Sequence, residues 1–254
     1  MSGQVGSISD ESCSHCGGAY KPGAAFCSAC GVRRGALAES LPVHEPNQLP
    51  FLLKLYIALL AVNLSGVLLV VHADANPFDT FVVASFGLGL VTLGFALARR
   101  SLWVSLYTTT GFGHVGFVGI LLAAPVVLAL VLGYVHGLER VFGLHNPDEL
   151  DVFQHHHVLW MLGLVAALPP IMEELAFRGV IFTGLRKTLG VTESLIISSF
   201  AFALLHLSIP SLLTHVPLGL YFGYLRHRSN SLWPSMFAHS LHNLGVIFVA
   251  QYGW

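Results

Sequence analysis

From Phe51 to the end of the chain, long apolar runs alternate with short polar breaks. A helix needs ~20 residues to cross a hydrocarbon core of ~30 Å, and most of these runs have about that length. The pattern therefore predicts an all-α polytopic membrane protein, a bundle of about seven to eight transmembrane helices. The expected helices span residues 51–71, 80–98, 112–137, 157–185, 193–208, 211–225 and 232–251. A break near Pro169-Pro170, or an interfacial segment at 101–111, would bring the number to eight.

The composition agrees with a membrane protein. Of the 254 residues, 54% are hydrophobic and 10% are charged, and the mean hydropathy is +0.71. Soluble domains carry about 25% charged residues, so an ordinary soluble fold is excluded. The formal net charge of −1 gives no reason to expect nucleic-acid binding. We expect membrane lipid around residues 51–254.

Basic residues predict the orientation of the bundle, because short loops rich in lysine and arginine stay in the cytoplasm. In the seven-helix arrangement, four basic pairs fall on one side of the membrane, while Arg140 lies on the other. The pairs are Arg33-Arg34, Arg99-Arg100, Arg186-Lys187 and Arg226 with Arg228. We therefore predict a multi-pass membrane protein with a cytoplasmic N-terminus.

The first fifty residues are rich in serine, glycine and proline and hold all four cysteines. The spacing C-x2-C-x10-C-x2-C is typical of a zinc ribbon, in which four thiolates complete a closed, structural zinc site. The predicted ligands are Cys13, Cys16, Cys27 and Cys30. Disulfides are disfavoured because the predicted topology places this segment in the reducing cytoplasm.

The predicted ribbon spans residues 1–34, and a linker at 35–50 with three prolines joins it to the membrane domain. It resembles the small zinc ribbons at the N-termini of many prokaryotic membrane proteins, which implies a prokaryotic cell membrane. Its basic residues are few: Lys21, Arg33 and Arg34. A protein partner is therefore expected in preference to nucleic acid.

Charged side chains interrupt the fourth apolar run in the stretch PPIMEELAFRG, residues 169–179. A carboxylate near mid-membrane costs at least ~2.5 kcal/mol, so it must be paired, face a polar cavity or be in use. Glu174 precedes Arg178 by four residues, the favoured spacing for a helical ion pair. Glu173 is rotated by about 100° from Glu174 and needs another explanation.

Polar groups in two later helices supply that explanation. His206 lies in the apolar stretch FAFALLHLS, and His239 and Asn243 lie one turn apart in SMFAHSLHNLG. A single such histidine would most simply be a packing residue that hydrogen-bonds a neighbouring helix. Together with Glu173, however, these groups offer a base, a proton carrier and oxyanion donors, which are the parts needed to hydrolyse an amide.

The motifs E-E-x-x-x-R, F-x-x-x-H and H-x-x-x-N, in this order, resemble the CPBP (Abi) family of intramembrane proteases. The family includes CAAX prenyl endopeptidases and bacteriocin-processing or immunity proteins. The resemblance covers about residues 115–251. The matching positions are Glu173, Glu174, Arg178, Phe202, His206, His239 and Asn243.

The resemblance implies a role for each position. Glu173 and His206 would activate the attacking water, and His239 and Asn243 would stabilise the oxyanion. Glu174, Arg178 and Phe202 would support the site. The expected substrate is a membrane-associated protein or peptide, with prenylated CAAX-type substrates as one precedent.

A metalloprotease remains an alternative, because a carboxylate and two histidines with water are also a catalytic zinc set. No H-E-x-x-H motif is present, and asparagine is a poor zinc ligand, so the metal-free, glutamate-dependent mechanism is favoured. His242 is the nearest rival for a catalytic role. The other histidines are interpreted as interfacial or packing residues: His114, His136, His155, His156, His157 and His215.

Two functions without proteolysis also remain open. A membrane scaffold or bacteriocin-immunity protein could keep the fold, although it would have no physical need for four catalytic-type side chains within the membrane. A transporter with a proton relay would predict internal repeats with broken helices, and no convincing repeat is found. The sequence therefore favours an enzyme.

Overall fold

The computed structural model describes residues 12–13, 18–20, 27, 48–100, 114–143, 153 and 157–252. Apart from one antiparallel bridge between Ser12 and Ala19, the regular structure in these ranges is helical. The expected all-α polytopic membrane fold is confirmed. The helices are α1 (Gln48–His72), α2 (Pro77–Ala98), α3 (His114–Phe142), α4 (Val158–Met161), η4 (Leu162–Ala167), α5 (Leu168–Glu174), η5 (Leu175–Ile181), α6 (Phe182–Leu185), α7 (Val191–Leu205), α8 (Ile209–Ser229) and α9 (Trp233–Tyr252).

The five segments α4 to α6 follow one another without interruption, so they form one long helix over residues 158–185. Each of the seven predicted runs therefore corresponds to one helical rod, and Pro169-Pro170 does not split the fourth. The segment 101–111 lies outside the described residues. The first helix begins at Gln48, three residues inside the predicted linker.

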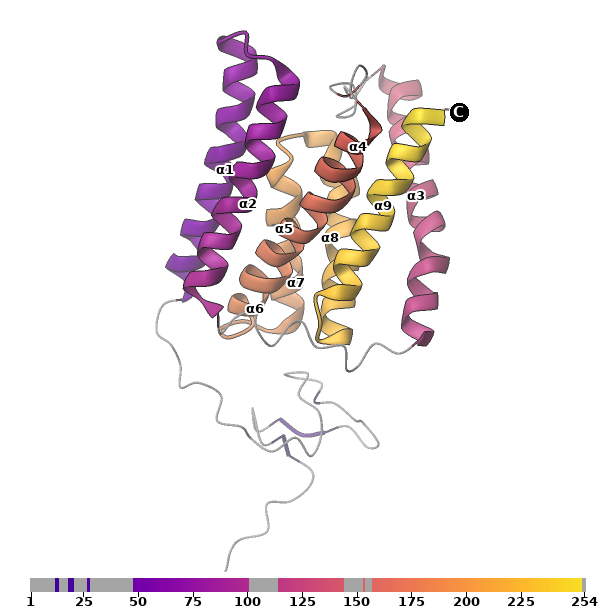
Figure 1. The fold of residues 1–254 in the computed structure, drawn as a ribbon. Helices are drawn as coiled ribbons and strands as arrows, with labels where there is room; N and C mark the ends of the chain where they lie inside the picture. Colours follow the sequence, from indigo (N-terminus) through magenta and orange to yellow (C-terminus); the bar gives the residue numbers. More distant parts are fainter. Residues whose placement is uncertain are drawn as a thin grey trace, which may run out of the picture.

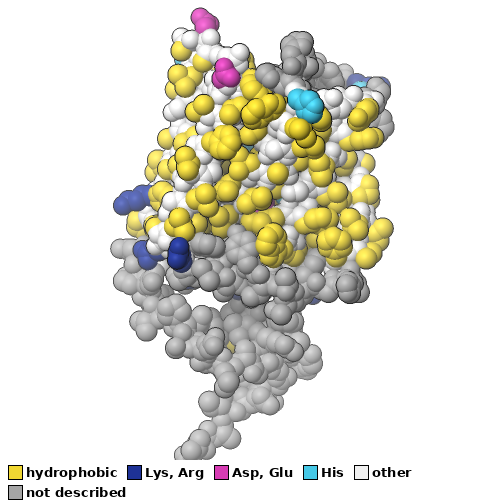
Figure 2. All heavy atoms as spheres, viewed as in Figure 1, with side chains coloured by type: hydrophobic (Ala, Val, Ile, Leu, Met, Phe, Trp, Pro, Cys, Tyr) yellow, Lys and Arg dark blue, Asp and Glu magenta, His cyan; other side chains and the backbone are white. Residues whose placement is uncertain are grey.

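Within the described ranges, four rods are long and apolar enough to cross a membrane by length and composition, at Gln48–His72, Pro77–Ala98, Gly116–Leu138 and Val158–Leu185. The apolar α7 is shorter, with 15 residues, and α8 and α9 have 21 and 20 residues. The rods stand side by side in alternating directions (Figure 1). Hydrophobic side chains cover the outer face in Figure 2, as expected for a surface that contacts lipid.

The alternating directions bring three of the predicted basic pairs to the same end of the bundle, because α2, α6 and α8 all finish there (Figure 1). Figure 2 shows Lys and Arg at this end of α1 and α2, and Asp and Glu at the opposite end. The fourth pair, Arg33-Arg34, lies outside the described residues. The structure thus places these three basic pairs at one end of the bundle, and the assignment of that end to the cytoplasm stays a prediction.

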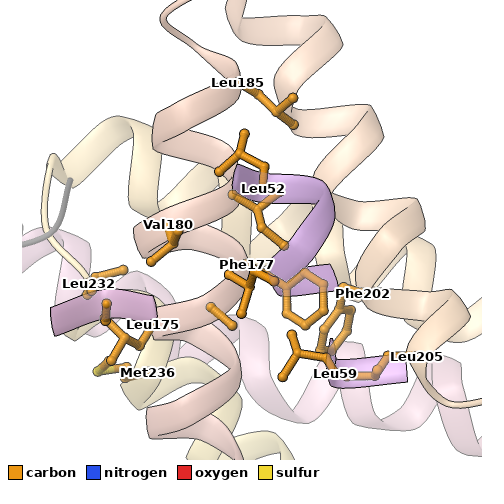
Figure 3. Close-up of a cluster of buried hydrophobic side chains, with 14 residues drawn as sticks. Leu52, Leu59, Leu175, Phe177, Val180, Leu185, Phe202, Leu205, Leu232 and Met236 are labelled. Carbon is orange, nitrogen blue, oxygen red and sulfur yellow. The ribbon is translucent and has the colours of Figure 1, made fainter. Parts of the chain in front are cut away.

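The main hydrophobic core joins α1, η5, α6, α7 and the start of α9 (Figure 3). Phe177 and Phe202 meet there edge to face, with ring centroids 5.5 Å apart. Both side chains are fully buried. This cluster fixes the charged face of η5 against α7.

Helices α7 and α8 approach each other closely because glycines on α8 leave room for α7. A Cβ at Gly219 would lie 2.8 Å from Cβ of Ser199, and one at Gly223 would lie 2.7 Å from a methyl carbon of Leu195. Contacts below 3.0 Å require the backbone or side chain to shift. The glycines therefore set the spacing between α7, which ends beside one of the site histidines described below, and α8, which carries another.

Two of the four predicted zinc ligands fall within the described residues. Cys13 and Cys27 are both buried, at 2% exposure. The amide of Cys13 donates to the carbonyl of Gly18 at 2.8 Å, next to the bridge between Ser12 and Ala19. Cys16 and Cys30 lie outside the described residues, so the zinc ribbon stays a prediction.

Candidate active site

The long helix over residues 158–185 carries two π-helical stretches, η4 and η5, on either side of the Glu173-Glu174 pair. Such stretches are rare and occur frequently at functional sites. The prolines of the PP pair lie between them, at the first two positions after Leu168. Because proline has no N–H, the pair removes two donors from the helix at this point.

The side chain of Asn243 replaces the missing donors. In an α-helix, a residue other than proline at the position of Pro169 would donate its N–H to the carbonyl of Val165. In a π-helix, the residue at the position of Pro170 would do so. Instead, Nδ2 of Asn243 on α9 donates to the oxygen of Val165 at 2.8 Å. The proline pair thus leaves the carbonyl of Val165 as an acceptor, and its hydrogen bond with Asn243 links α9 to η4. The second N–H of the Asn243 side-chain amide can make another contact.

Glu174 and Arg178 form the predicted ion pair at the centre of the bundle. Nη1 of Arg178 donates to Oε1 of Glu174 at 2.8 Å, and both side chains are fully buried. Nη2 of Arg178 donates to the carbonyl of Gly219 on α8 at 2.9 Å. The guanidinium also lies 4.5 Å from the ring centroid of Phe202. The pair therefore links η5 to both α7 and α8.

His239 on α9 connects the two glutamates. Its Nδ1 lies 3.1 Å from Oε1 of Glu174, and its Nε2 lies 3.9 Å from Oε2 of Glu173. An ionised carboxylate only accepts hydrogen bonds, so Nδ1 carries a proton. Phe222 of α8 stacks on the imidazole, with centroids 4.7 Å apart and planes 16° apart. The ring orientation is thus fixed by a polar contact and an aromatic one.

Glu173 differs from Glu174 in being partly exposed. Its side chain keeps 18% exposure, against 0% for Glu174. A partly exposed carboxylate next to a histidine has room for a reactant, whereas the buried one is committed to Arg178. This difference agrees with the rotation of about 100° expected between adjacent helical residues.

His206 lies at the point where α7 ends. The next residue, Leu207, has a φ of 52°, the left-handed conformation that commonly ends a helix and is unusual for a leucine. Nδ1 of His206 is 3.1 Å from the carbonyl of Phe202, so Nδ1 donates and Nε2 of the neutral ring presents a lone pair. Asn63 of α1 donates to the carbonyl of Leu205 at 2.6 Å and holds this end in place.

The aromatic ring of Phe202 lies among the histidines. Its centroid is 5.2 Å from that of His206 and 5.8 Å from that of His239. The described ion-pair contact of Glu173 nevertheless goes to His239 and not to His206. The predicted partnership of Glu173 with His206 therefore has no direct contact to support it in the described residues.

His215 of α8 was missed as a site residue. Its ring centroid lies 3.9 Å from that of His206 and 5.9 Å from that of Phe202. Nδ1 of His215 is 2.9 Å from the carbonyl of Ser211. No family motif includes this position, and the packing of α7 against α8 was the missing information.

The structure also shows the contacts of His157 and His242. His157 caps α4, since its Nδ1 accepts from the amide of Leu159 at 3.2 Å, which agrees with an interfacial position. His242 is 8% exposed, and its buried Nδ1 has no hydrogen-bond partner among the residues that the structure describes. His155 and His156 lie outside the described residues.

The site was also tested as a metal centre. Among the described side chains, no group of three or more His, Cys, Asp or Glu is arranged to hold a metal ion. His239 directs one ring nitrogen toward each glutamate, and His206 uses Nδ1 on a backbone carbonyl.

Comparisons with known proteins relate this part of the chain to peptidases. The family model "Type II CAAX prenyl endopeptidase Rce1-like" matches residues 155–245, which contain every site residue named above. The chain is 32% identical over 114 residues to "Putative membrane peptidase YdiL" of Bacillus subtilis (strain 168). This alignment covers 43% of the chain and 46% of the relative, so it spans about half of each. No solved structure matches the chain.

Proposed function

We propose that the protein is an intramembrane endopeptidase that hydrolyses peptide bonds of membrane-associated substrates. The observation that carries the proposal is the arrangement of Glu173, Glu174 and His239, in which one carboxylate is committed to Arg178 and the other is partly exposed. The similarity of residues 155–245 to an endopeptidase family supports the same reaction class. Prenylated CAAX-type proteins are the substrate precedent that the family name suggests.

In the proposed reaction, the Glu173 carboxylate removes a proton from water while the water oxygen bonds to the scissile carbonyl carbon. The carbonyl electron pair moves to the oxygen and gives a tetrahedral oxyanion. When the carbonyl re-forms, the C–N bond breaks, and the proton held by Glu173 passes to the leaving nitrogen. The products are a new carboxyl group and a new amine, and Glu173 is again a carboxylate.

His206 and His239 assist at different points of this sequence. Nε2 of His206 presents a lone pair that can accept a hydrogen bond from the attacking water. His239 can donate to the oxyanion only when Nε2 is protonated in addition to Nδ1, and the Glu174 carboxylate beside Nδ1 then lies next to that positive charge. The free N–H of Asn243 is the second oxyanion donor.

We favour the glutamate-dependent mechanism over a metalloprotease because the chain has no H-E-x-x-H motif and His239 directs one ring nitrogen toward each glutamate. If zinc did bind here, Glu173, His206 and His239 would be its ligands, and zinc would supply Lewis-acid activation of water. The competing non-catalytic function is a membrane scaffold or bacteriocin-immunity protein, for which the buried Glu174–Arg178 pair would be purely structural.

The N-terminal segment is proposed to hold a structural zinc ion on Cys13, Cys16, Cys27 and Cys30. Support comes from the cysteine spacing and from the burial of Cys13 and Cys27. A thiolate set of four leaves no open position for catalysis. The ribbon would then serve as a contact site for another protein on the cytoplasmic side.

The function is tested by comparing newly formed protein termini in membranes of cells that express the wild-type chain or Glu173→Gln at matched levels. Glu193→Gln is the matched control, because Glu193 is an exposed glutamate in the first turn of α7. A set of termini present with wild type and Glu193→Gln but lost with Glu173→Gln supports the peptidase. Identical profiles for all three favour the scaffold.

A further inference from the structure

A group of basic side chains gathers where α6 and α8 end. Arg186 follows the last residue of α6, and Arg226, His227 and Arg228 occupy the last turn of α8. Both helices finish at the same end of the bundle (Figure 1). We call Arg186, Arg226 and His227 the basic cluster, and Arg228, which is exposed in the same turn, lies outside it.

Arg226 is unusual within this cluster because it is buried. The residue keeps 2% exposure, and its Nη1 donates to Oδ1 of Asn230 at 3.2 Å. Within the described part of the chain, Nε of Arg226 is buried without a hydrogen-bond partner, and so is Nδ1 of the neighbouring His227. Two buried polar atoms at this end of α8 therefore have no hydrogen-bond partner among the described residues.

In the described part of the chain, the charged side chains that act on these two residues are all positive. Arg186 lies close enough to Arg226 to repel it, and His227 is repelled by Arg186, Arg226 and Arg228. A buried cation ordinarily has a counter-charge and complete hydrogen bonding. The amide oxygen of Asn230 carries no formal negative charge and accepts a hydrogen bond from Nη1 of Arg226. It therefore neither neutralises the guanidinium nor satisfies Nε.

Two ordinary explanations account for only some of these basic side chains. Cytoplasmic loops are enriched in basic residues, and the carbonyls at the end of a helix favour nearby cations. Both explain exposed side chains such as Arg228. Neither explains why a guanidinium is buried with an unused donor beside other cations.

We propose that the basic cluster binds a phosphate-bearing anion, with Arg226 as the central ligand. A guanidinium fork presents parallel N–H donors that match phosphate oxygens. Nε and the remaining Nη hydrogens of Arg226, with Arg186 and His227 beside them, would surround the anion. The phosphate could belong to an anionic phospholipid headgroup or to a free phosphate ion, and the site is independent of the proposed peptidase.

The test measures the unfolding temperature of the purified full-length protein in detergent. The additions are phosphatidylglycerol, the zwitterionic phosphatidylcholine at equal amount, and inorganic phosphate against chloride at matched ionic strength. Each is repeated with Arg226→Gln, with Arg226→Lys, and with Arg228→Gln as the matched control. Arg228 is exposed and lies in the same helical turn.

The expected result is a rise of several degrees with phosphatidylglycerol, larger than with phosphatidylcholine, in wild type and Arg228→Gln. The rise should be lost in Arg226→Gln and reduced in Arg226→Lys, which keeps the charge without the fork. The same pattern with inorganic phosphate alone would support the site with free phosphate as its ligand.

The proposal is overturned by any of three results. The first is a wild-type protein that responds to neither phosphatidylglycerol nor phosphate, which decides the matter even if Arg226→Gln fails to fold. The second is an equal response in wild type and Arg226→Gln. The third is a loss of the temperature rise in Arg228→Gln as large as the loss in Arg226→Gln, which would indicate that surface charge in general causes the rise.

Discussion

The imidazole rings of His206 and His215 pack against each other across the α7–α8 interface, with centroids 3.9 Å apart and planes at 41°. Each ring uses its Nδ1 on a backbone carbonyl of its own helix, that of Phe202 or of Ser211. Both rings are therefore held in fixed orientations. The contact makes His215 a positioning residue for His206 in the proposed reaction.

Substitutions of His215 should separate packing from proton transfer. His215→Ala removes the ring that holds His206, and a displacement of about 1 Å in a catalytic group can lower the rate about 10²-fold. We expect a lower kcat with little change in KM. His215→Phe keeps a ring of similar size and should retain most of the activity. Equal, severe loss in both variants would instead indicate that a nitrogen of His215 takes part in the chemistry.

The two adjacent glutamates should respond differently to removal of charge. Glu174→Gln leaves Arg178 fully buried without its carboxylate, which costs about 3–5 kcal/mol of folding stability. At roughly 2–4 °C per kcal/mol, the unfolding temperature in detergent should fall by about 6 °C or more. Glu173→Gln should leave the unfolding temperature nearly unchanged, because Glu173 is partly exposed. A similar fall in both variants would show that the two carboxylates share one structural role.

Asn243 should contribute to stability as well as to catalysis. Asn243→Ala leaves the carbonyl of Val165 without its donor, a loss of about 1–3 kcal/mol. Adding Pro169→Ala restores an N–H that can donate to the same carbonyl. The double variant should therefore recover thermal stability but not peptidase activity. Recovery of neither would show that the contact with Val165 is incidental.

The predicted zinc ribbon should be visible in the metal content of the purified protein. We expect about one zinc per chain, with four thiols released when a strong chelator removes it. Cys27→Ser should lower the zinc content, whereas peptidase activity after chelation should persist if the active site is metal-free. Unchanged zinc in Cys27→Ser would place the metal elsewhere.

The helices could be predicted closely because their signal is local. Each apolar run of the described part corresponds to a helical rod, and the observed ends differ from the predicted ones by a few residues. The spacing of Glu174 and Arg178 likewise predicted their ion pair, since residues four apart share a helical face. Such features follow from the period of the α-helix alone.

The remaining features depend on how separate helices meet. The hydrogen bond from Asn243 to the carbonyl of Val165 joins residues 78 positions apart. The packing of His215 on His206 depends on the glycines that let α7 and α8 approach. A sequence pattern within one helix carries no information about that approach, so His215 was interpreted as a packing or interfacial residue.

The most direct test of the peptidase is hydrolysis by the purified protein in proteoliposomes made with water enriched in oxygen-18. The substrate is a peptide spanning a cleavage site identified from the membrane termini. We predict one oxygen-18 atom in the new C-terminal carboxyl with wild type and Glu193→Gln, and no cleavage with the folded Glu173→Gln variant. Cleavage by Glu173→Gln at the wild-type rate would contradict the account.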